Sequence, residues 1–148
     1  MKVAIGTDHA GLEIKNEIAE HLKKVGYDVC DYGTFDKTSC DYVDYAEKVA
    51  VAVSKGECDK GILVCMTGIG MSVAANKIPG IRAALVRDEE TAVLTREHND
   101  SNVLVIAGKF TPVDEANRIC DLWLKTEFSN EERHQRRIDK ISLLEMKY

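Results

Sequence analysis

The segment with the clearest capacity for chemistry is built around Cys65. It follows the apolar run 62–64, which predicts a buried strand, and it precedes Thr67-Gly68-Ile69-Gly70 and a predicted helix start at Ser72 to Asn76. Free backbone N–H groups at such a strand-to-helix turn can bind an anion, and the positive end of a helix dipole favours a thiolate. Cys65 is therefore a candidate base or nucleophile beside an anion site. The pattern alone explains Gly68 and Gly70 equally well as a tight turn.

Two further pairs of residues could transfer protons. Asp8 and His9 follow the predicted strand Lys2–Thr7, where an acid and an imidazole can contact sugar hydroxyls or phosphate. The alternative is that Asp8 only caps a helix beginning near Gly11. His98-Asn99 comes at the end of a predicted helix, where the alternative is a C-cap with a surface histidine. Histidine is nevertheless the side chain best suited to proton transfer near neutral pH.

Arg133 and Arg137 form the third candidate feature. They are four residues apart, so on a helix they project from one face and could bind a phosphate with forked hydrogen bonds. The alternative is a solvated basic face. With a formal net charge of −5, the chain is not expected to bind nucleic acid in general, and one tight arginine pair fits a small anionic ligand better than a polyanion.

Several other classes of site are not indicated. The third glycine of a dinucleotide fingerprint would fall at Val73, and no phosphate-binding loop of the nucleoside triphosphatase type occurs. The five cysteines are odd in number and never spaced C-x-x-C, which argues against a disulfide framework or a zinc cluster. No apolar run approaches the roughly 20 residues of a membrane span, and the start of the chain reads as a strand rather than a signal peptide. We therefore expect a cytoplasmic protein with no membrane association.

Strand and helix patterns alternate along the chain. The predicted strands are Lys2–Thr7, Tyr27–Asp31, Ile62–Val64, Ile81–Val86 and Val103–Ala107. The predicted helices have an apolar face from Ile14 to Val25, an apolar face from Ala46 to Val53, a start at Ser72, the range Asp88–Arg96, a start near Pro112, and the range Asn130–Met146. This order predicts a single α/β domain over residues 1–148, a doubly wound sandwich with a mostly parallel five-stranded sheet. Ligands in such folds bind at the carboxyl ends of the strands. The last helix has no strand to pair with, so it should cover the domain or reach a neighbouring subunit.

Seven short motifs occur in one order and cover nearly the whole chain. They are Asp8-His9-Ala10-Gly11, Asp41-Tyr42, Cys65 with Thr67-Gly68-Ile69-Gly70, Ala74-Ala75-Asn76-Lys77, Gly80-Ile81-Arg82-Ala83, Arg96-Glu97-His98-Asn99-Asp100 and Arg133-His134-Gln135. Together they resemble the B-type ribose-5-phosphate isomerase family, which includes the subunits of galactose-6-phosphate isomerase. The resemblance implies a Rossmann-like αβα sandwich, metal-free and cofactor-free isomerisation of a sugar phosphate, and a homodimer or dimer of dimers with active sites completed across the interface.

The resemblance also implies a role for each candidate residue. His98 would open the sugar ring with help from Thr67 and Asp8, and Cys65 would be the base at C2. The remaining contacts implied are the backbone N–H groups of Met66, Thr67, Gly68, Ile69 and Gly70 on the enediolate, Asn99 and Tyr42 on sugar hydroxyls, and His9, Lys109, Arg133 and Arg137 on the phosphate. His98 and Asn99 would come from the protomer opposite Cys65.

Three residues depart from the family pattern. Met66 stands where glycine is common, Lys109 where an arginine often contacts phosphate, and Val43 where proline commonly follows the tyrosine. Lysine replaces a planar fork by a point charge, and the Met66 side chain could reshape the anion-binding loop. The expected reaction is the interconversion of ribose 5-phosphate and ribulose 5-phosphate. The alternatives are a galactose-6-phosphate or allose-6-phosphate isomerase, and a non-catalytic module that binds a sugar phosphate.

Overall fold

Strands and helices alternate through the computed structural model, which describes all 148 residues. The strands are β1 (Lys2–Thr7), β2 (Asp28–Asp31), β3 (Lys60–Cys65), β4 (Ala83–Val86) and β5 (Val103–Ala107). The helices are α1 (Leu12–Lys24), α2 (Tyr42–Ser54), α3 (Ile69–Ala75), α4 (Glu89–Asn99), α5 (Val113–Lys125) and α6 (Glu132–Lys147), with a 3-10 turn η1 at His9–Gly11.

All five strands are parallel, in the order β2-β1-β3-β5-β4. The prediction of a doubly wound α/β sandwich with a five-stranded sheet is therefore confirmed. The chain winds from β1 outward to β2, then returns to build the other half from β3. Strand order therefore reverses between β1 and β3, and the crevice outside the carboxyl ends of these two strands is where ligands bind in folds of this class.

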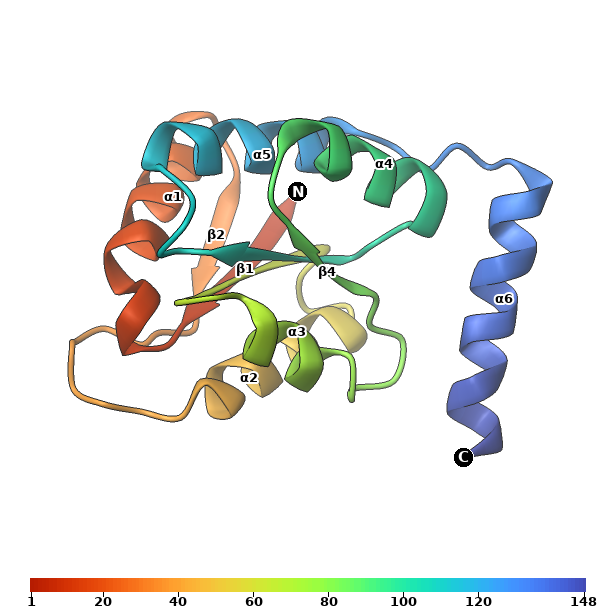
Figure 1. Cartoon of the computed structure of the whole chain (residues 1–148), viewed down its shortest axis with the longest axis horizontal. Helices are drawn as coiled ribbons and strands as arrows, with labels where there is room; N and C mark the ends of the chain where they lie inside the picture. Colours follow the sequence, from red (N-terminus) through yellow and green to blue (C-terminus); the bar gives the residue numbers. More distant parts are fainter.

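Helices cover both faces of the sheet. In Figure 1, α1, α4 and α5 lie on one side of the strands and α2 and α3 on the other. Because side chains alternate along a strand, Ile62 and Val64 of β3 join the core under α1 and α5, whereas Leu63 and Cys65 join the core under α2 and α3. The thiol of Cys65 is thus on the α2 and α3 side of the sheet edge.

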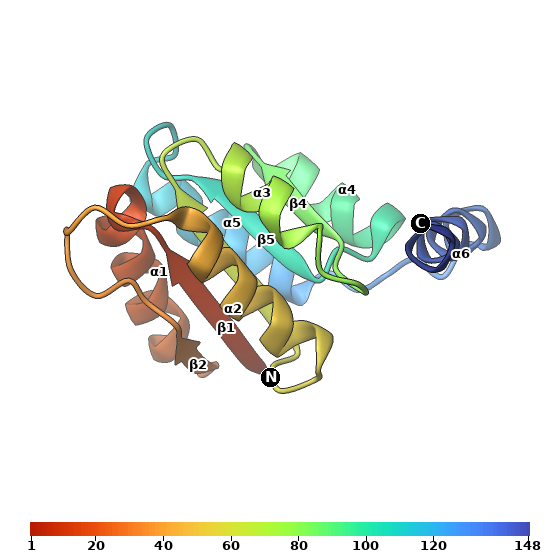
Figure 2. The same ribbon diagram turned by 90° about the horizontal axis from the view of Figure 1, so that it is seen from below.

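Helix α6 stands apart from the sandwich. Both ribbon views show it beside the domain, joined to α5 by an extended segment (Figures 1 and 2). It contacts the end of α4 and leaves large apolar side chains exposed, among them Leu143, Leu144 and Met146. Helix α6 therefore does not cover its own sheet. None of the helices combines the length and apolar character needed to cross a membrane.

Several bounds predicted from the sequence are wrong, among them the following four. Helix α3 begins at Ile69, three residues before Ser72, because left-handed Gly68 (φ 75°) turns the chain directly into it. Val25 is not on the buried face of α1 but follows its last turn, with 49% of its surface exposed. Strand β2 begins at Asp28, since the N–H of Tyr27 donates to the carbonyl of Leu22. Strand β4 begins only at Ala83.

Candidate active site

The last residue of β3, Cys65, holds the thiol, and the loop that follows it holds a group of backbone donors. The N–H of Gly68 donates to the Sγ of Cys65 at 3.1 Å, and the N–H of Ile69 donates to the Oγ1 of Thr67 at 3.3 Å. An N–H group directed at a cysteine sulfur is an arrangement that stabilises a thiolate. The amides of Met66, Thr67 and Gly70 donate to no group of the protein. These amides make the loop competent to bind an anion next to a buried cysteine.

Tyr42 lies over this loop from the first residue of α2. A Cβ placed on Gly70 would be 2.7 Å from the Cζ of the Tyr42 ring, so the ring and the glycine are in direct contact. The position needs glycine because any side chain would displace the ring. Tyr42 remains 41% exposed, so its hydroxyl is accessible beside the loop. The structure therefore brings Tyr42 and the Cys65 loop together.

Asp8 has the structural role that the sequence left open as an alternative. Its Oδ1 accepts hydrogen bonds from the N–H groups of Ala10 at 3.1 Å and Gly11 at 3.2 Å, which caps η1. The other carboxylate oxygen, Oδ2, accepts no hydrogen bond from the protein. The side chain of Asp8 is therefore fixed by its cap and still has one oxygen for a second partner.

The neighbouring His9 is held in one tautomer by the backbone. The N–H of Cys40 donates to the Nδ1 of His9 at 3.2 Å, so in the neutral ring this nitrogen is the acceptor and Nε2 carries the proton. The ring lines a cavity of about 490 Å³ at the carboxyl ends of β1 and β3. His9 is thus set to donate a hydrogen bond into this cavity.

Cationic side chains gather around the same cavity. Lys109, which follows β5, lines it together with Met66 and His9, and the N–H of Lys109 donates to the carbonyl of Met66 at 3.1 Å. Lys37 lines it from the segment between β2 and α2, and its Nζ contacts the Glu13 carboxylate at 2.7 Å. That contact lowers the pKa of Glu13 below its ordinary value. The cavity is suited to an anion such as a phosphate group.

Sequence reasoning missed two contributors to this cavity. Lys37 lies in a polar, turn-rich segment and has no motif around it, so nothing in the sequence distinguishes it from other surface lysines. Cys40 contributes through its backbone N–H, which no residue type could have revealed. Only the path of the segment from 32 to 41 over the end of the sheet brings both residues to His9.

The second group of predicted residues lies at the opposite ends of the strands. His98 and Asn99 close α4, and the chain then enters β5 at its amino end. Cys65 is paired with Ala107, the last residue of β5. Four strand steps separate the two ends, about 13 Å at 3.3 Å per residue. One chain therefore does not bring His98 and Asn99 to Cys65.

His98 packs against α6. Its ring stacks on His134, with the centroids 4.3 Å apart and the planes at 14°. His134 is 3% exposed and its Nε2 has no hydrogen-bond partner. Burial, and then the nearby His98, lower the pKa of His134 below its ordinary 6.5. His98 is thus half-buried in this stack rather than fully exposed at the end of α4.

Arg133 and Arg137 lie on the same helix as His134. Both are exposed, and the Nε of Arg133 contacts the carboxylate of Glu131 at 2.7 Å. They are remote from His9 and Lys109 in the chain's own fold, because α6 stands apart from the sandwich (Figure 2). The predicted site is thus divided into two halves. The Cys65 half holds the thiol, the free amides and the cationic cavity, and the His98 half holds two histidines, Asn99 and the arginine pair.

Comparisons with known proteins assign the chain to one family. A model of the family described as Ribose/Galactose Isomerase matches residues 3–141. Ribose-5-phosphate isomerase B of Escherichia coli is 43% identical over 146 residues, which covers 99% of this chain and 97% of that protein. A putative sugar phosphate isomerase of Bacillus subtilis is 49% identical, with 99% of each chain covered.

Solved structures give the same result. The structure of ribose-5-phosphate isomerase B from Clostridium thermocellum superposes with a TM-score of 0.98 at 51% identity, covering 100% of this chain and 99% of that one. The enzyme of the same description from Mycoplasma genitalium, solved with bound ribulose-5-phosphate, superposes with a TM-score of 0.95 at 44% identity, covering 99% and 97%.

Proposed function

Because this chain belongs to the ribose/galactose isomerase family, we propose that it interconverts ribose 5-phosphate and ribulose 5-phosphate, with Cys65 as the base. The observation that carries the proposal is the contact of a buried thiol with the Gly68 amide, beside three free amides at the point where strand order reverses. The similarity to enzymes named ribose-5-phosphate isomerase B, over nearly the full chain, supports the choice of substrate.

The proton transfer uses the Cys65 half of the site. With the substrate in its open aldehyde form, the Cys65 thiolate takes the proton from C2, and the C2–H electrons form the C1–C2 double bond of an enediolate as the C1 carbonyl oxygen becomes negative. The free amides of Met66, Thr67 and Gly70 can stabilise that oxygen, since fixed donors aimed at developing charge lower the barrier. The proton then returns to C1, and the C2 hydroxyl loses its proton and becomes the ketone. That proton passes to the negative C1 oxygen, which becomes the C1 hydroxyl of the product.

The other end of the substrate fits the cationic cavity. Its phosphate would accept hydrogen bonds from His9 Nε2–H and from Lys109, with Lys37 within the same cavity. Tyr42 and the free oxygen of Asp8 would contact sugar hydroxyls. This assignment keeps the phosphate on the α1 side of the sheet edge and the reacting carbons near the thiol on the other side.

Ring opening needs the His98 half, and we assign it to a second copy of the chain. In the furanose the C1–O4 bond must break, O4 gains a proton and the C1 hydroxyl loses one, which suits an acid such as His98 with Thr67 and Asp8 passing protons. Two observations support a shared site. His98 precedes the amino end of β5, whereas Cys65 pairs with the carboxyl end of β5, about 13 Å along the strand, and α6 with its exposed apolar residues stands apart from its own domain. In a homodimer or dimer of dimers, Asn99, Arg133 and Arg137 would reach the substrate with His98.

A six-carbon substrate is the second candidate. The galactose-6-phosphate isomerase subunit of Clostridium acetobutylicum is 38% identical over 144 residues, covering 97% of this chain and 83% of that protein. Met66 lines the cavity where other members commonly have glycine, so it occupies space next to the substrate. We therefore favour the shorter pentose phosphate over galactose 6-phosphate or allose 6-phosphate. All five cysteines are free, which suits the reducing cytoplasm where we expect this enzyme to act.

The test is ketose formation from a panel of five- and six-carbon aldose phosphates. Ribose 5-phosphate should react best, Cys65→Ala should abolish the reaction, and the matched control Cys30→Ala, on strand β2 at the edge of the sheet, should leave it unchanged. A preference for a six-carbon sugar would replace the substrate. Binding of all sugars without any ketose would indicate a non-catalytic module and overturn the proposal.

A further inference from the structure

The end of α4, which presents His98 and Asn99, has an unusual backbone. Asp100 caps the helix in the left-handed region with φ 45° and ψ 46°, a conformation that residues other than glycine rarely adopt. Helices leave their last carbonyl groups without intrahelical partners, so such an end needs donors from elsewhere in the protein. The side chain that supplies them determines how the final turn is oriented.

Arg82 supplies these donors. Its Nε donates to the carbonyls of Asn99 and Asp100, both at 3.0 Å, and its Nη2 donates to the Asp100 carbonyl at 2.9 Å and carboxylate at 3.0 Å. One guanidinium thereby holds the two residues that follow His98. Arg82 and Asn99 also line a common cavity of about 310 Å³ between β4, α4 and α6.

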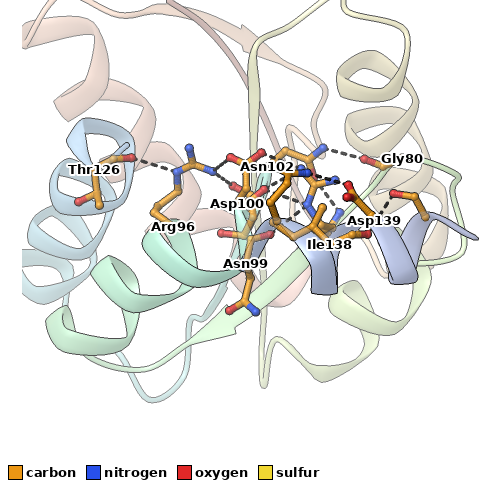
Figure 3. A network of polar contacts seen from close by, with 12 residues as sticks. Gly80, Arg96, Asn99, Asp100, Asn102, Thr126, Ile138 and Asp139 are labelled. Atoms are coloured by element: carbon orange, nitrogen blue, oxygen red, sulfur yellow. Dashed lines mark hydrogen bonds and ion pairs between the residues drawn. The ribbon is translucent and has the colours of Figure 1, made fainter. Parts of the chain in front are cut away.

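A second arginine fixes the other side of Asp100. Arg96 is 5% exposed, and its Nη1 contacts the Asp100 carboxylate at 2.7 Å and donates to the Ser101 carbonyl at 2.6 Å. The Asp100 carboxylate therefore lies between two guanidinium groups, each on its own oxygen. Figure 3 shows Arg96 beside Asp100 from close by. Charge-assisted hydrogen bonds of this kind are stronger and geometrically stricter than neutral ones.

The backbone of Arg82 is itself held in place. Its N–H donates to the Oδ1 of Asn102 at 2.8 Å. The Nδ2 of Asn102 in turn donates to the Gly80 carbonyl at 2.8 Å (Figure 3). The next residue, Ala83, exchanges two hydrogen bonds with the side chain of Asn76, which follows the last turn of α3. The guanidinium thus projects from a rigid frame rather than from a mobile loop.

We propose that Arg82 is a positioning residue of the isomerase, acting through Asn99 and Asp100 to orient His98 for ring opening. This inference rests on the proposed function. The ring of His98 stacks on His134 of α6, a helix that stands apart from the domain. A misplacement of about 1 Å of an acid commonly costs on the order of 10²-fold in rate. The guanidinium group of Arg82, by binding the carbonyls of Asn99 and Asp100, restricts such a displacement of His98.

The two directions of the reaction separate ring opening from proton transfer. Ribose 5-phosphate is a furanose that must open, whereas ribulose 5-phosphate has its C5 oxygen esterified and stays open. Exchange of a C1 proton of ribulose 5-phosphate in D₂O therefore needs Cys65 but no ring opening. A residue that positions His98 affects conversion of the aldose and largely spares this exchange. A residue needed only for folding would reduce both alike.

The experiment measures both rates for Arg82→Lys and Asp100→Asn, together with the melting temperature. Lysine keeps the charge and loses the fork, and asparagine tolerates the left-handed backbone and loses the charge, so both variants are expected to fold. We expect kcat for ribose 5-phosphate to fall by about 10²-fold and the exchange by only a few-fold, the pattern also expected for His98→Ala. The matched control is Arg118→Lys, whose guanidinium pairs with Glu89 at the other end of α4 and should change neither rate.

The outcomes are distinct. Proportional loss of both rates, or loss of neither, would overturn the role of Arg82 while leaving Cys65-dependent isomerisation intact. If the unaltered protein neither converts ribose 5-phosphate nor exchanges the C1 proton of ribulose 5-phosphate, the proposed function fails, and this inference fails with it.

Discussion

Gly68→Ala should damage both the stability and the activity of the protein. Gly68 has φ 75°, and an added Cβ would lie 2.4 Å from the Cδ1 of Leu85 and 3.4 Å from the backbone nitrogen of Ala107. The left-handed conformation alone costs an L residue about 1 to 2 kcal/mol. Displacing the Leu85 methyl adds about 1 kcal/mol at the low end of the range for overpacking. We expect a total loss of about 2 to 3 kcal/mol in the free energy of unfolding.

Gly56 provides a matched control for the backbone contribution. It has nearly the same φ, 72°, and an added Cβ there would meet no atom within 4 Å. Gly56→Ala should therefore lose only the conformational share of about 1 to 2 kcal/mol and keep full activity. Urea denaturation of both variants measures the difference in stability directly.

The activity of Gly68→Ala should fall because the turn must shift to relieve the contact. The Gly68 N–H then no longer points at the Cys65 Sγ, and removal of one such donor typically costs on the order of 10²-fold in kcat. Steady-state assays with ribose 5-phosphate measure the loss. If Gly68→Ala unfolds like Gly56→Ala and retains full kcat, the close packing of this turn around the thiol is not what sustains catalysis.

Three further predictions concern protonation and the size of the cavity. Burial lowers the pKa of Lys60 from 10.5 to about 8, so between these pH values the unfolded chain holds the extra proton and the free energy of unfolding rises with pH. In denaturation curves across this pH range, Lys60→Gln should flatten the rise and should add about 1 kcal/mol to the free energy of unfolding at neutral pH, after allowance for solvent screening. The pKa of His134 in the folded chain lies below its ordinary 6.5, so as the pH falls below 6.5 the unfolded chain binds a proton before the folded chain does, and stability decreases. The melting temperature of His134→Phe, which keeps a ring against His98, should lack this decrease. Met66→Gly enlarges the cavity beside His9, so the ratio of kcat/KM for allose 6-phosphate to kcat/KM for ribose 5-phosphate should rise about tenfold. An unchanged ratio would show that Met66 does not limit substrate size.

The fold was largely predictable because its signals are local. Apolar runs for β1, β3 and β5, the helical spacing of apolar residues in α1, α2 and α5, and Asp88 as the N-cap of α4 all have direct sequence signatures. The short α3 was misplaced because its start is set by one left-handed glycine and by contacts with Leu85 and Tyr42 rather than by periodicity. Such contacts join residues far apart in the sequence.

The residues of the site were predictable by type and by resemblance, but their grouping was not predictable from spacing. Cys65, Tyr42 and the loop amides converge because β3 ends and α2 begins at the same edge of the sheet. His98 is carried to the other edge by the direction of α4, a fact of topology. Arg82 belongs to the motif Gly80-Ile81-Arg82-Ala83, but this motif indicates no chemical role by itself. The role is visible only in the carbonyl groups that Arg82 contacts.

The most direct test of Cys65 as the base is conversion of ribose 5-phosphate in D₂O, with deuterium at C1 of the ribulose 5-phosphate measured for the unaltered protein, Cys65→Ala and the control Cys30→Ala. If Cys65 removes the proton and its thiol exchanges with solvent, the unaltered protein should place deuterium at C1 of the product. Cys65→Ala should give neither product nor label, and Cys30→Ala should behave as the unaltered protein does. Product formed with no deuterium, or undiminished conversion by Cys65→Ala, would contradict the account.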